Sequence, residues 1–412
     1  MKIALIAPSH LPSRRANSVQ VTKMAQALTR LGHETTLIVP APPGAAANVP
    51  WDELAHHYGL AHPFPVVWLP AHPRARGYDF GWRAVRWSRR WPADLVYTRL
   101  PQAAALSSAL GLPTLYEIHD LPQGKLGPWL FRRIARAPAT RGIIAITRAL
   151  ARDLESIIAS PIPNTHPSTT SGLRPPSAQD ATPNTQYPIP NTLIAPDGVD
   201  LARYENLPNP AAARSLLPTP YALRPASFTA GYTGHLYPGR GAELLIQLAA
   251  RLPDIHFLIV GGNPEDLARL QSKIEERRTK NENLTLTGFV PNAELPLYQA
   301  ACDVLLMPYQ RRVAASSGGD IARYLSPMKL FEYLACGRAI VSSDLPVLRE
   351  VLTPENAVLL PPDDVDAWVN ALRELRANPE KRAALAAQAR LEAQKYAWEK
   401  RAEQILERLS LG

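Results

Sequence analysis

The sequence predicts an α/β protein made of two Rossmann-like domains. Its 412 residues exceed what one hydrophobic core usually organises, so two domains of ordinary size are expected. Both halves alternate short apolar runs, typical of buried parallel strands, with segments of helical period. Glycine-containing loops follow several of these runs, at the edge where such sheets bind ligands. The fold class is therefore α/β with doubly wound parallel sheets.

The first half opens as a β-loop-α-β unit. An apolar run ends at Pro8, and a polar loop leads to a helix through Val21 and Leu28. Asn17 and Gln20 are expected at the N-cap and third positions of that helix, since these residue types satisfy free backbone N–H groups there. Further strands are expected at 35–39, 66–69, 94–98, 114–118 and 142–146.

The second half repeats the pattern after an interruption. Residues 160–191 are dominated by Pro, Asn, Thr and Ser, which predicts a disordered insertion because few apolar side chains offset the ordering entropy. Strands are then expected at 229–233, 256–260, 284–287, 304–307 and 339–342, and the tail has a helical period. We predict domains at 1–205 and 206–385, with a terminal helix in 386–412.

Charge is unevenly distributed along the chain. Residues 1–150 hold 18 Lys and Arg against 7 Asp and Glu, whereas the remaining 262 residues hold 27 against 29. The densest part, 81–91, interleaves arginines with tryptophans, which favours peripheral contact with an anionic membrane. RNA would also suit this pattern, but no nucleic-acid motif accompanies it, so no nucleic acid is expected.

Location follows from what the sequence lacks. No apolar run approaches the roughly 20 residues of a membrane span, and the start has no secretory pattern. The two cysteines, Cys302 and Cys336, have no metal-ligand spacing and form no disulfide framework. We expect a cytoplasmic protein, peripheral at the inner face of the membrane, that needs no metal and no cofactor.

Residues 326–337 carry the most informative pattern. Lys329 and Glu332 lie three apart near the start of an expected helix, and therefore on one helix face. The free N–H groups and positive dipole end of such a helix attract anions. Lys329 is expected on a phosphate and Glu332 on ribose hydroxyls, with Ser326 and Met328 beside them. The pattern predicts a site for a nucleoside diphosphate.

A second pattern is the glycine-rich loop at 234–241, between an expected strand and helix. Gly234 lets backbone N–H groups approach a phosphate, and Arg240 can bind one through two hydrogen bonds. Two cations from separate loops, Arg240 and Lys329, could clamp one diphosphate.

These segments closely resemble the donor site of family 4 retaining glycosyltransferases, also called glycosyl transferases group 1, which have the GT-B fold. That resemblance implies two Rossmann-like domains facing each other across a cleft and a terminal helix that crosses back to the first domain. The family motif is a glutamate, seven residues and a second glutamate. Glu332 matches the second, but Tyr324 stands at the first, where the family holds the donor sugar.

The resemblance also assigns roles to other residues. It places His235, Gly261, Gly262, Phe289 and Val290 around the donor nucleotide. His119 matches a family histidine beside the transferred sugar, with Asp120 next to it. Arg14 and Arg15 stand in a loop where the family often has paired glycines facing the donor.

The resemblance implies a metal-independent glycosyltransferase that moves a sugar from a nucleotide-sugar donor to a glycan, lipid-linked or small-molecule acceptor, with retention. His119, Arg240 and Lys329 are the expected catalytic residues. Two alternatives stay open. One is a nucleotide-sugar 2-epimerase of the same fold, and the other is a non-catalytic subunit that supports a partner transferase.

Overall fold

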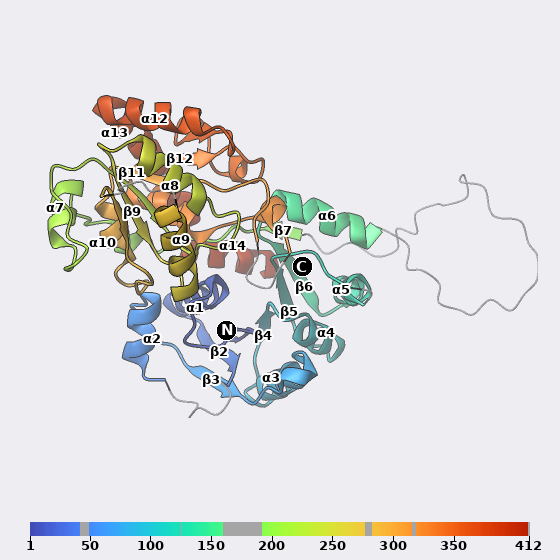
Figure 1. Ribbon diagram of the computed structural model, residues 1–412. Coiled ribbons are helices and arrows are strands. Elements are labelled where there is room, and N and C mark those ends of the chain that lie inside the picture. The colour runs from blue at the N-terminus through green and yellow to red at the C-terminus, as the bar shows by residue number, and fades with distance from the viewer. Residues whose placement is uncertain (42–48, 125, 160–191, 277–281, 315–318, 411–412) are drawn as a thin grey trace, which may run out of the picture.

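The computed structural model describes residues 1–41, 49–124, 126–159, 192–276, 282–314 and 319–410 (Figure 1). The disordered insertion predicted at 160–191 lies outside the described residues. Two parallel sheets, each between layers of helices, build the molecule, and a fold of two Rossmann-like domains is thereby confirmed.

The first sheet has seven parallel strands in the order β3-β2-β1-β4-β5-β6-β7. They are β1 (Lys2–Ile6), β2 (Glu34–Pro40), β3 (Val66–Leu69), β4 (Leu95–Thr98), β5 (Thr114–Ile118), β6 (Thr140–Ala145) and β7 (Thr192–Ile194). Strand order reverses between β1 and β4, which pair in register from Ile3 with Leu95 to Ile6 with Thr98. The carboxyl edge at such a reversal is where these sheets bind ligands.

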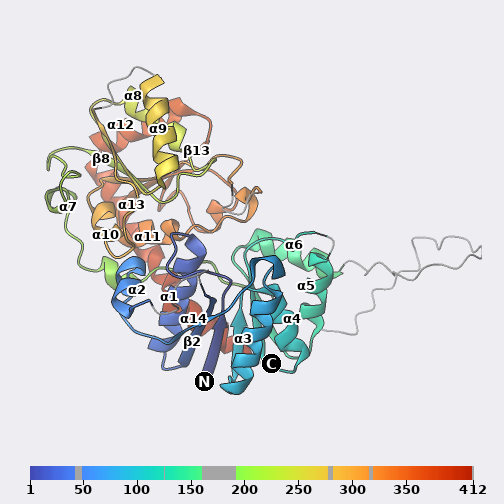
Figure 2. The same ribbon diagram turned by 60° about the horizontal axis from the view of Figure 1, so that its bottom comes forward.

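Helices cover both faces of this sheet (Figure 2). The helices are α1 (Ala16–Arg30), α2 (Trp51–Tyr58), α3 (Tyr78–Arg90), α4 (Pro101–Ala109), α5 (Gly127–Arg136) and α6 (Arg148–Ala159). One core cluster joins α1 and α2 to one face of the sheet, and two other clusters join α3 to α6 to the opposite face. This split follows from right-handed crossovers in both directions from β1.

The second sheet has six parallel strands in the order β10-β9-β8-β11-β12-β13. They are β8 (Thr229–Thr233), β9 (His256–Val260), β10 (Leu284–Leu286), β11 (Val304–Met307), β12 (Ala339–Ser343) and β13 (Val358–Leu360). Its helices are α7 (Pro210–Leu216), α8 (Ala242–Arg251), α9 (Pro264–Glu276), α10 (Leu295–Ala300), α11 (Met328–Cys336), α12 (Val365–Ala377) and α13 (Pro379–Ala393). Separate core clusters lie on its two faces.

One local expectation is wrong. Helix α1 begins at Ala16 with Arg15 at the N-cap and no side-chain cap, so Asn17 lies inside the first turn. Gln20 does not cap the helix either, because its amide donates to the Glu117 carboxylate at 2.7 Å. A distant buried carboxylate has therefore replaced the local capping contact that the sequence suggested.

The last helix, α14 (Trp398–Ser410), belongs to the packing of the first domain. Trp398, Ala402 and Ile405 are buried in the same cluster as α1 and α2. The Val199 amide donates to the Tyr396 carbonyl at 2.8 Å, and the Trp398 amide donates back to the Val199 carbonyl at 3.2 Å. The outgoing and returning connections between the domains are thus held side by side.

Arg401 holds α14 against the first sheet. Its guanidinium lies 3.0 Å from Oε1 of Glu117, and both side chains are almost fully buried. It also donates to the carbonyls of Pro196 at 2.8 Å and Ala195 at 3.1 Å. Although burial opposes ionisation, the Arg401 charge and the His119 hydrogen bond hold the pKa of Glu117 below its usual range. This fully partnered pair fixes the terminal helix against β5.

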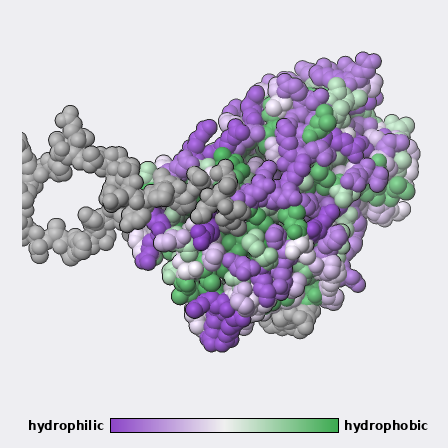
Figure 3. Space-filling model, turned by 180° about the vertical axis from the view of Figure 1, so that it is seen from behind, coloured by the Kyte–Doolittle hydropathy of each residue, from purple (hydrophilic) through white to green (hydrophobic). Residues whose placement is uncertain are grey.

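Figure 3 shows hydrophilic residues over much of the face opposite to that of Figure 1, with hydrophobic residues scattered among them. In the part of the chain that the structure describes, no helix has the length and apolar character to cross a bilayer.

Arg401→Met should destabilise the protein by about 3–5 kcal/mol, because it leaves Glu117 buried and charged without its ion-pair partner. Urea unfolding would measure this loss. Adding Glu117→Gln to the Arg401→Met variant should recover part of the stability, since the orphaned charge is then absent. An Arg401→Met variant as stable as the wild type would contradict the anchoring role.

Candidate active site

A cavity of about 480 Å³ lies between the two domains. The first domain lines it with the loop before α1 and with His57 of α2, and the second domain lines it with loops at the carboxyl ends of β8, β9 and β10 and with the start of α11. Twelve predicted site residues lie on its wall: Arg14, Arg15, Gly234, His235, Arg240, Gly261, Gly262, Phe289, Val290, Met328, Lys329 and Glu332.

Two cationic side chains at this cavity lack anionic partners among the described residues. The Lys329 ammonium lies 3.6 Å from the centroid of the Tyr232 ring and has no hydrogen-bond partner. Arg240 donates Nη1 to the Tyr309 hydroxyl at 3.2 Å, but its buried Nε has no partner. A cation over an aromatic face is stabilised, although less than by a carboxylate. The pair is electrostatically suited to an incoming anion.

Glycines make room for these cations. A side chain at Gly234 would meet the Lys329 ammonium at 2.8 Å, and its φ of +128° also disfavours any other residue. Gly261 has a φ of +117° and lies against the Gly234 backbone. The two glycine turns therefore allow the loops after β8 and β9 to approach each other beside Lys329.

The start of α11 faces the same cavity. Its N-cap residue, Pro327, provides no side-chain cap, and the Leu330 amide donates to the Pro327 carbonyl at 2.8 Å, so the N–H groups of Met328 and Lys329 remain available to a ligand. Glu332 lies one turn further along and accepts a hydrogen bond from the Gln299 amide at 3.1 Å. Gln299 is itself held by the Tyr204 hydroxyl at 2.9 Å. This buried chain orients the carboxylate toward the cavity.

The other end of the cavity is aromatic. Phe289 lies beneath the Arg14 guanidinium, 4.3 Å from the ring centroid, and 5.4 Å from the His57 ring. The Asn292 amide donates to the His57 carbonyl at 2.9 Å. Residues of the first domain thus cover the loop after β10. The cavity holds Lys329 and Arg240 in one part and the Phe289 ring, stacked with Arg14, in another, an arrangement that suits a diphosphate joined to a planar base.

Four predicted residues lie outside this cavity. Ser326 accepts from the Asp197 amide at 3.4 Å. Tyr324 packs in the core cluster of β5, β6 and α6, and its hydroxyl donates to Asp153 at 2.5 Å. Asp120 accepts from the Leu121 amide at 2.8 Å and the Gln123 amide at 3.0 Å. At Tyr324 the donor-motif segment of the second domain therefore packs against the first domain.

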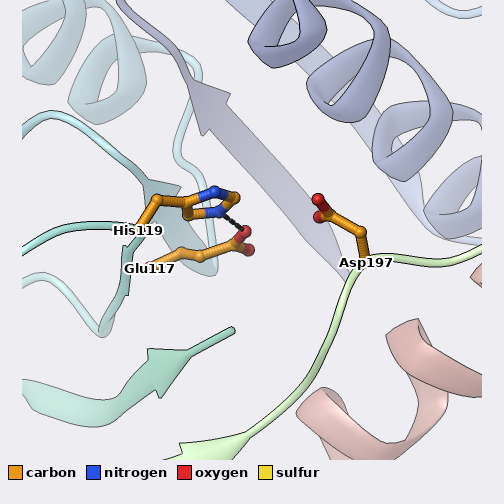
Figure 4. A group of neighbouring side chains, drawn as sticks. All are labelled: Glu117, His119 and Asp197. Carbon is orange, nitrogen blue, oxygen red and sulfur yellow. Dashed lines mark hydrogen bonds and ion pairs between the residues drawn. The ribbon is translucent and has the colours of Figure 1, made fainter. Parts of the chain in front are cut away.

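The fourth, His119, follows β5 and is 19% exposed. Its Nε2 lies 2.5 Å from Oε1 of Glu117, and Asp197 faces the pair from the loop after β7 (Figure 4). Burial, together with the nearby Arg99 charge, lowers the pKa of His119 to about 4. Burial also raises the pKa of Asp197 to about 7. His119 is therefore neutral at neutral pH and oriented by Glu117.

The ligand atoms of Glu117, His119 and Asp197 lie within 4.8 Å of one another, a spacing that could hold a metal ion. The surroundings do not favour that use. Glu117 already accepts from Gln20, Tyr97 and Arg401 as well as contacting His119. A divalent ion here would have to displace these donors and lie beside the Arg401 charge.

Comparisons with known proteins agree with this geometry. Residues 18–164 match the family model described as Glycosyltransferase Family 4, and residues 227–378 match Glycosyl transferases group 1. The chain is a family 4 glycosyltransferase. The recognition of the family from its motifs is thereby confirmed, and neither the epimerase nor the non-catalytic alternative is favoured.

Among similar proteins, the transferase is 26% identical to the phosphatidyl-myo-inositol mannosyltransferase of Mycolicibacterium smegmatis, over 98% of this chain and 92% of that protein. It is 25% identical to the D-inositol 3-phosphate glycosyltransferase of Xylanimonas cellulosilytica, over 79% of this chain and 68% of the relative. The structure of Anabaena HepE with UDP superposes with a TM-score of 0.70 at 16% identity and covers both chains completely, which shows the shared GT-B fold.

Some residues of the transferase's site could not be found from motifs. Gln299 and His57 contact the cavity or its carboxylate only because the fold brings them there. Glu117 was visible in the sequence two residues before His119, and in extended backbone this spacing directs both side chains to the same side. The role of Arg401 could not be predicted from a local motif, because its partner Glu117 is 284 residues away in the chain.

Nucleoside diphosphate binding should be coupled to proton uptake at Lys329. Burial lowers the pKa of Lys329 well below its usual range, and Arg240 lowers it further. A bound diphosphate favours the charged form of Lys329 and raises its pKa. At a pH between the pKa of the free protein and that of the complex, ligand binding is therefore accompanied by uptake of a proton. Calorimetry in buffers of different ionisation enthalpy, at several pH values below the usual lysine range, should detect the uptake. It should vanish in Lys329→Met, and uptake that persists there would assign the proton to another group.

Proposed function

We propose that the enzyme transfers a sugar from a nucleotide-sugar donor to an acceptor hydroxyl with retention of configuration and without a metal. The main support is the pairing of Lys329 and Arg240, without anionic partners among the described residues, beside the uncapped start of α11. Glu332 one turn further on suits ribose hydroxyls, and the cavity around Phe289 suits a base. This arrangement matches a diphosphonucleoside along its whole length.

In this proposal the second domain stabilises the leaving group. As the bond between the sugar and the diphosphate breaks, negative charge accumulates on the phosphate oxygens. Lys329, Arg240 and the N–H groups of α11 are fixed in place before reaction, so they stabilise that charge with little reorganisation. The acceptor oxygen forms the new bond on the face from which the diphosphate departs, and the acceptor proton leaves with the departing phosphate.

His119 acts from the first domain in this proposal. Because Glu117 accepts from Nε2, the hydrogen on that nitrogen is fixed and Nδ1 remains for other contacts. A neutral ring held in this way can contact the transferred sugar without adding a second positive charge near the cleft. Glu117 positions His119, and Arg401 keeps Glu117 ionised.

The names of the relatives bear on the acceptor. Both the mannosyltransferase and the inositol phosphate glycosyltransferase are named for inositol acceptors that carry phosphate. We propose that this transferase also takes a polyhydroxylated acceptor bearing a phosphate group, either soluble or within a lipid head group. Synthesis of cell-envelope glycolipids or polysaccharides is the setting that this acceptor class suits.

Peripheral membrane contact is also proposed, through α3. Arg83, Arg86, Arg89 and Arg90 are all exposed on this helix, and Trp82 is 49% exposed beside them. Arginines with an exposed aromatic side chain suit an anionic head-group layer. Such contact would keep a cytoplasmic enzyme close to lipid-linked acceptors.

The two domains should divide binding and turnover between them. Glu332→Ala should weaken nucleoside diphosphate affinity by one to two orders of magnitude, since a hydrogen bond to a charged group contributes about 1.5–3 kcal/mol. His119→Ala should leave that affinity almost unchanged while turnover collapses. Calorimetry and sugar-transfer assays on both variants would measure this. Equal losses of affinity would contradict the assignment, as would full activity of His119→Ala.

Vesicle sedimentation should show binding that rises with anionic lipid and falls with salt. Replacing Arg83 and Arg90 with Gln should weaken it roughly 10- to 30-fold, at about 1 kcal/mol for each charge near the surface. Gln at Arg224 and Arg373, two exposed arginines of the second domain, removes the same charge and should have little effect. Equal behaviour of the two variants would exclude α3 as the contact.

A further inference from the structure

A second cavity, of about 660 Å³, lies between the domains and is rich in arginine. The first domain contributes Arg148 and Arg152 from the start of α6. The second domain contributes Arg311, Arg323 and Arg349 from loops after β11 and β12. The acidic residues on its wall are Asp320 and Glu350. Positive charge is therefore in clear excess.

Three of these arginines are paired with carboxylates. Arg311 pairs with Asp363 at 3.2 Å, Arg323 with Asp153 at 2.8 Å, and Arg349 with Asp344 at 2.7 Å. Arg148 and Arg152, in contrast, have no ion-pair partner among the described residues, and both are exposed to the cavity. The unbalanced charge thus lies on the side of the first domain.

The acidic residues on the wall do not neutralise the charges of Arg148 and Arg152. Asp320 accepts from the amides of Val313 at 2.9 Å and Ala322 at 3.0 Å. Glu350 reaches across from the second domain to the first turn of α6, where the amides of Arg148 and Ala149 donate to it at 2.8 and 3.2 Å. These carboxylates hold backbone, so the guanidinium groups remain available to a ligand.

Short chain segments connect this cavity to the first one. Tyr309 lines the first cavity and Arg311 the second, so their Cα atoms are at most about 7 Å apart. Arg323 lines the second cavity and Met328 the first, only five residues further along. The two cavities are therefore neighbours at the carboxyl edges of the two sheets.

We propose that the arginine cavity binds the phosphate group of the acceptor and so directs the acceptor's hydroxyl toward the donor sugar in the first cavity. Planar guanidinium groups match phosphate oxygens in geometry as well as charge. This inference rests on the proposed transfer function. It specifies a recognition site, with Arg148 and Arg152 as the binding residues.

Inorganic phosphate is the first probe, used with the full-length protein after the donor site has been saturated with nucleoside diphosphate. Phosphate should raise the thermal midpoint in a saturable way in the wild type, since a ligand that binds only the folded form stabilises it. Arg148→Gln with Arg152→Gln should weaken the apparent phosphate affinity at least tenfold. Both side chains are exposed, and the amides that Glu350 binds remain in place.

Arg141→Gln with Arg224→Gln is the matched control, because it removes two exposed arginines that do not line the cavity. This control should keep the wild-type phosphate affinity. Equal phosphate responses in all three proteins would overturn the inference. Nucleoside diphosphate binding is measured separately. If the proposed function is wrong, that binding should be lost as well, whereas it should persist if only the inference about the arginine cavity is wrong.

The source of the phosphate is then tested with two acceptors, myo-inositol 1-phosphate in solution and vesicles containing phosphatidylinositol. If the Arg148/Arg152 variant loses transfer to the soluble phosphate monoester, the site serves a small-molecule acceptor. A loss confined to vesicles assigns it to a lipid phosphodiester. In either case KM for the acceptor should rise at least tenfold, while the donor KM changes little. An unchanged acceptor KM with both substrates would overturn the inference.

Discussion

The ion pair between Arg401 and Glu117 connects features that lie far apart in the chain. It joins the terminal helix to β5, and the same carboxylate orients His119 at the end of that strand. Breaking a buried pair of this kind exposes an uncompensated charge to a low dielectric, which is more costly than never having formed the pair. The terminal helix and His119 are therefore linked through one carboxylate, in addition to the hydrophobic packing that holds α14 against the first domain.

A different electrostatic situation holds in the cavity around Lys329. There the protein keeps Lys329 and Arg240 close together over aromatic rings. The tyrosines around Arg240 offset its burial, whereas the burial of Lys329 is only partly offset, by the charge of Glu332. The cost is seen in the depressed pKa of Lys329. An anionic ligand would supply the missing partner, and its binding would recover the free energy that burial of the charge costs the folded protein. Burial of Lys329 thus opposes stability in the free protein and favours the binding of an anion.

Sequence patterns predicted the sheets well because parallel strands are short, apolar and regularly spaced. All five strands expected in the second half begin and end within one residue of β8, β9, β10, β11 and β12. The donor motif placed Lys329 and Glu332 on one cavity for the same reason, since local spacing fixes a helix face. Contacts such as Gln299 with Glu332, or Tyr324 with Asp153, join distant segments and depend on tertiary packing that no local pattern encodes.

Tyr324 shows how a departure from the family motif is accommodated. A carboxylate at this position would lie beside Asp153 and within an apolar cluster, where a second negative charge is unfavourable. The tyrosine instead buries its ring and donates its hydroxyl to Asp153, which ties the donor-motif segment to α6. Arg323 pairs with the same aspartate. An interdomain contact therefore occupies the position that holds the donor sugar in the family motif. Recognition of a donor sugar would then depend on other side chains of the cavity.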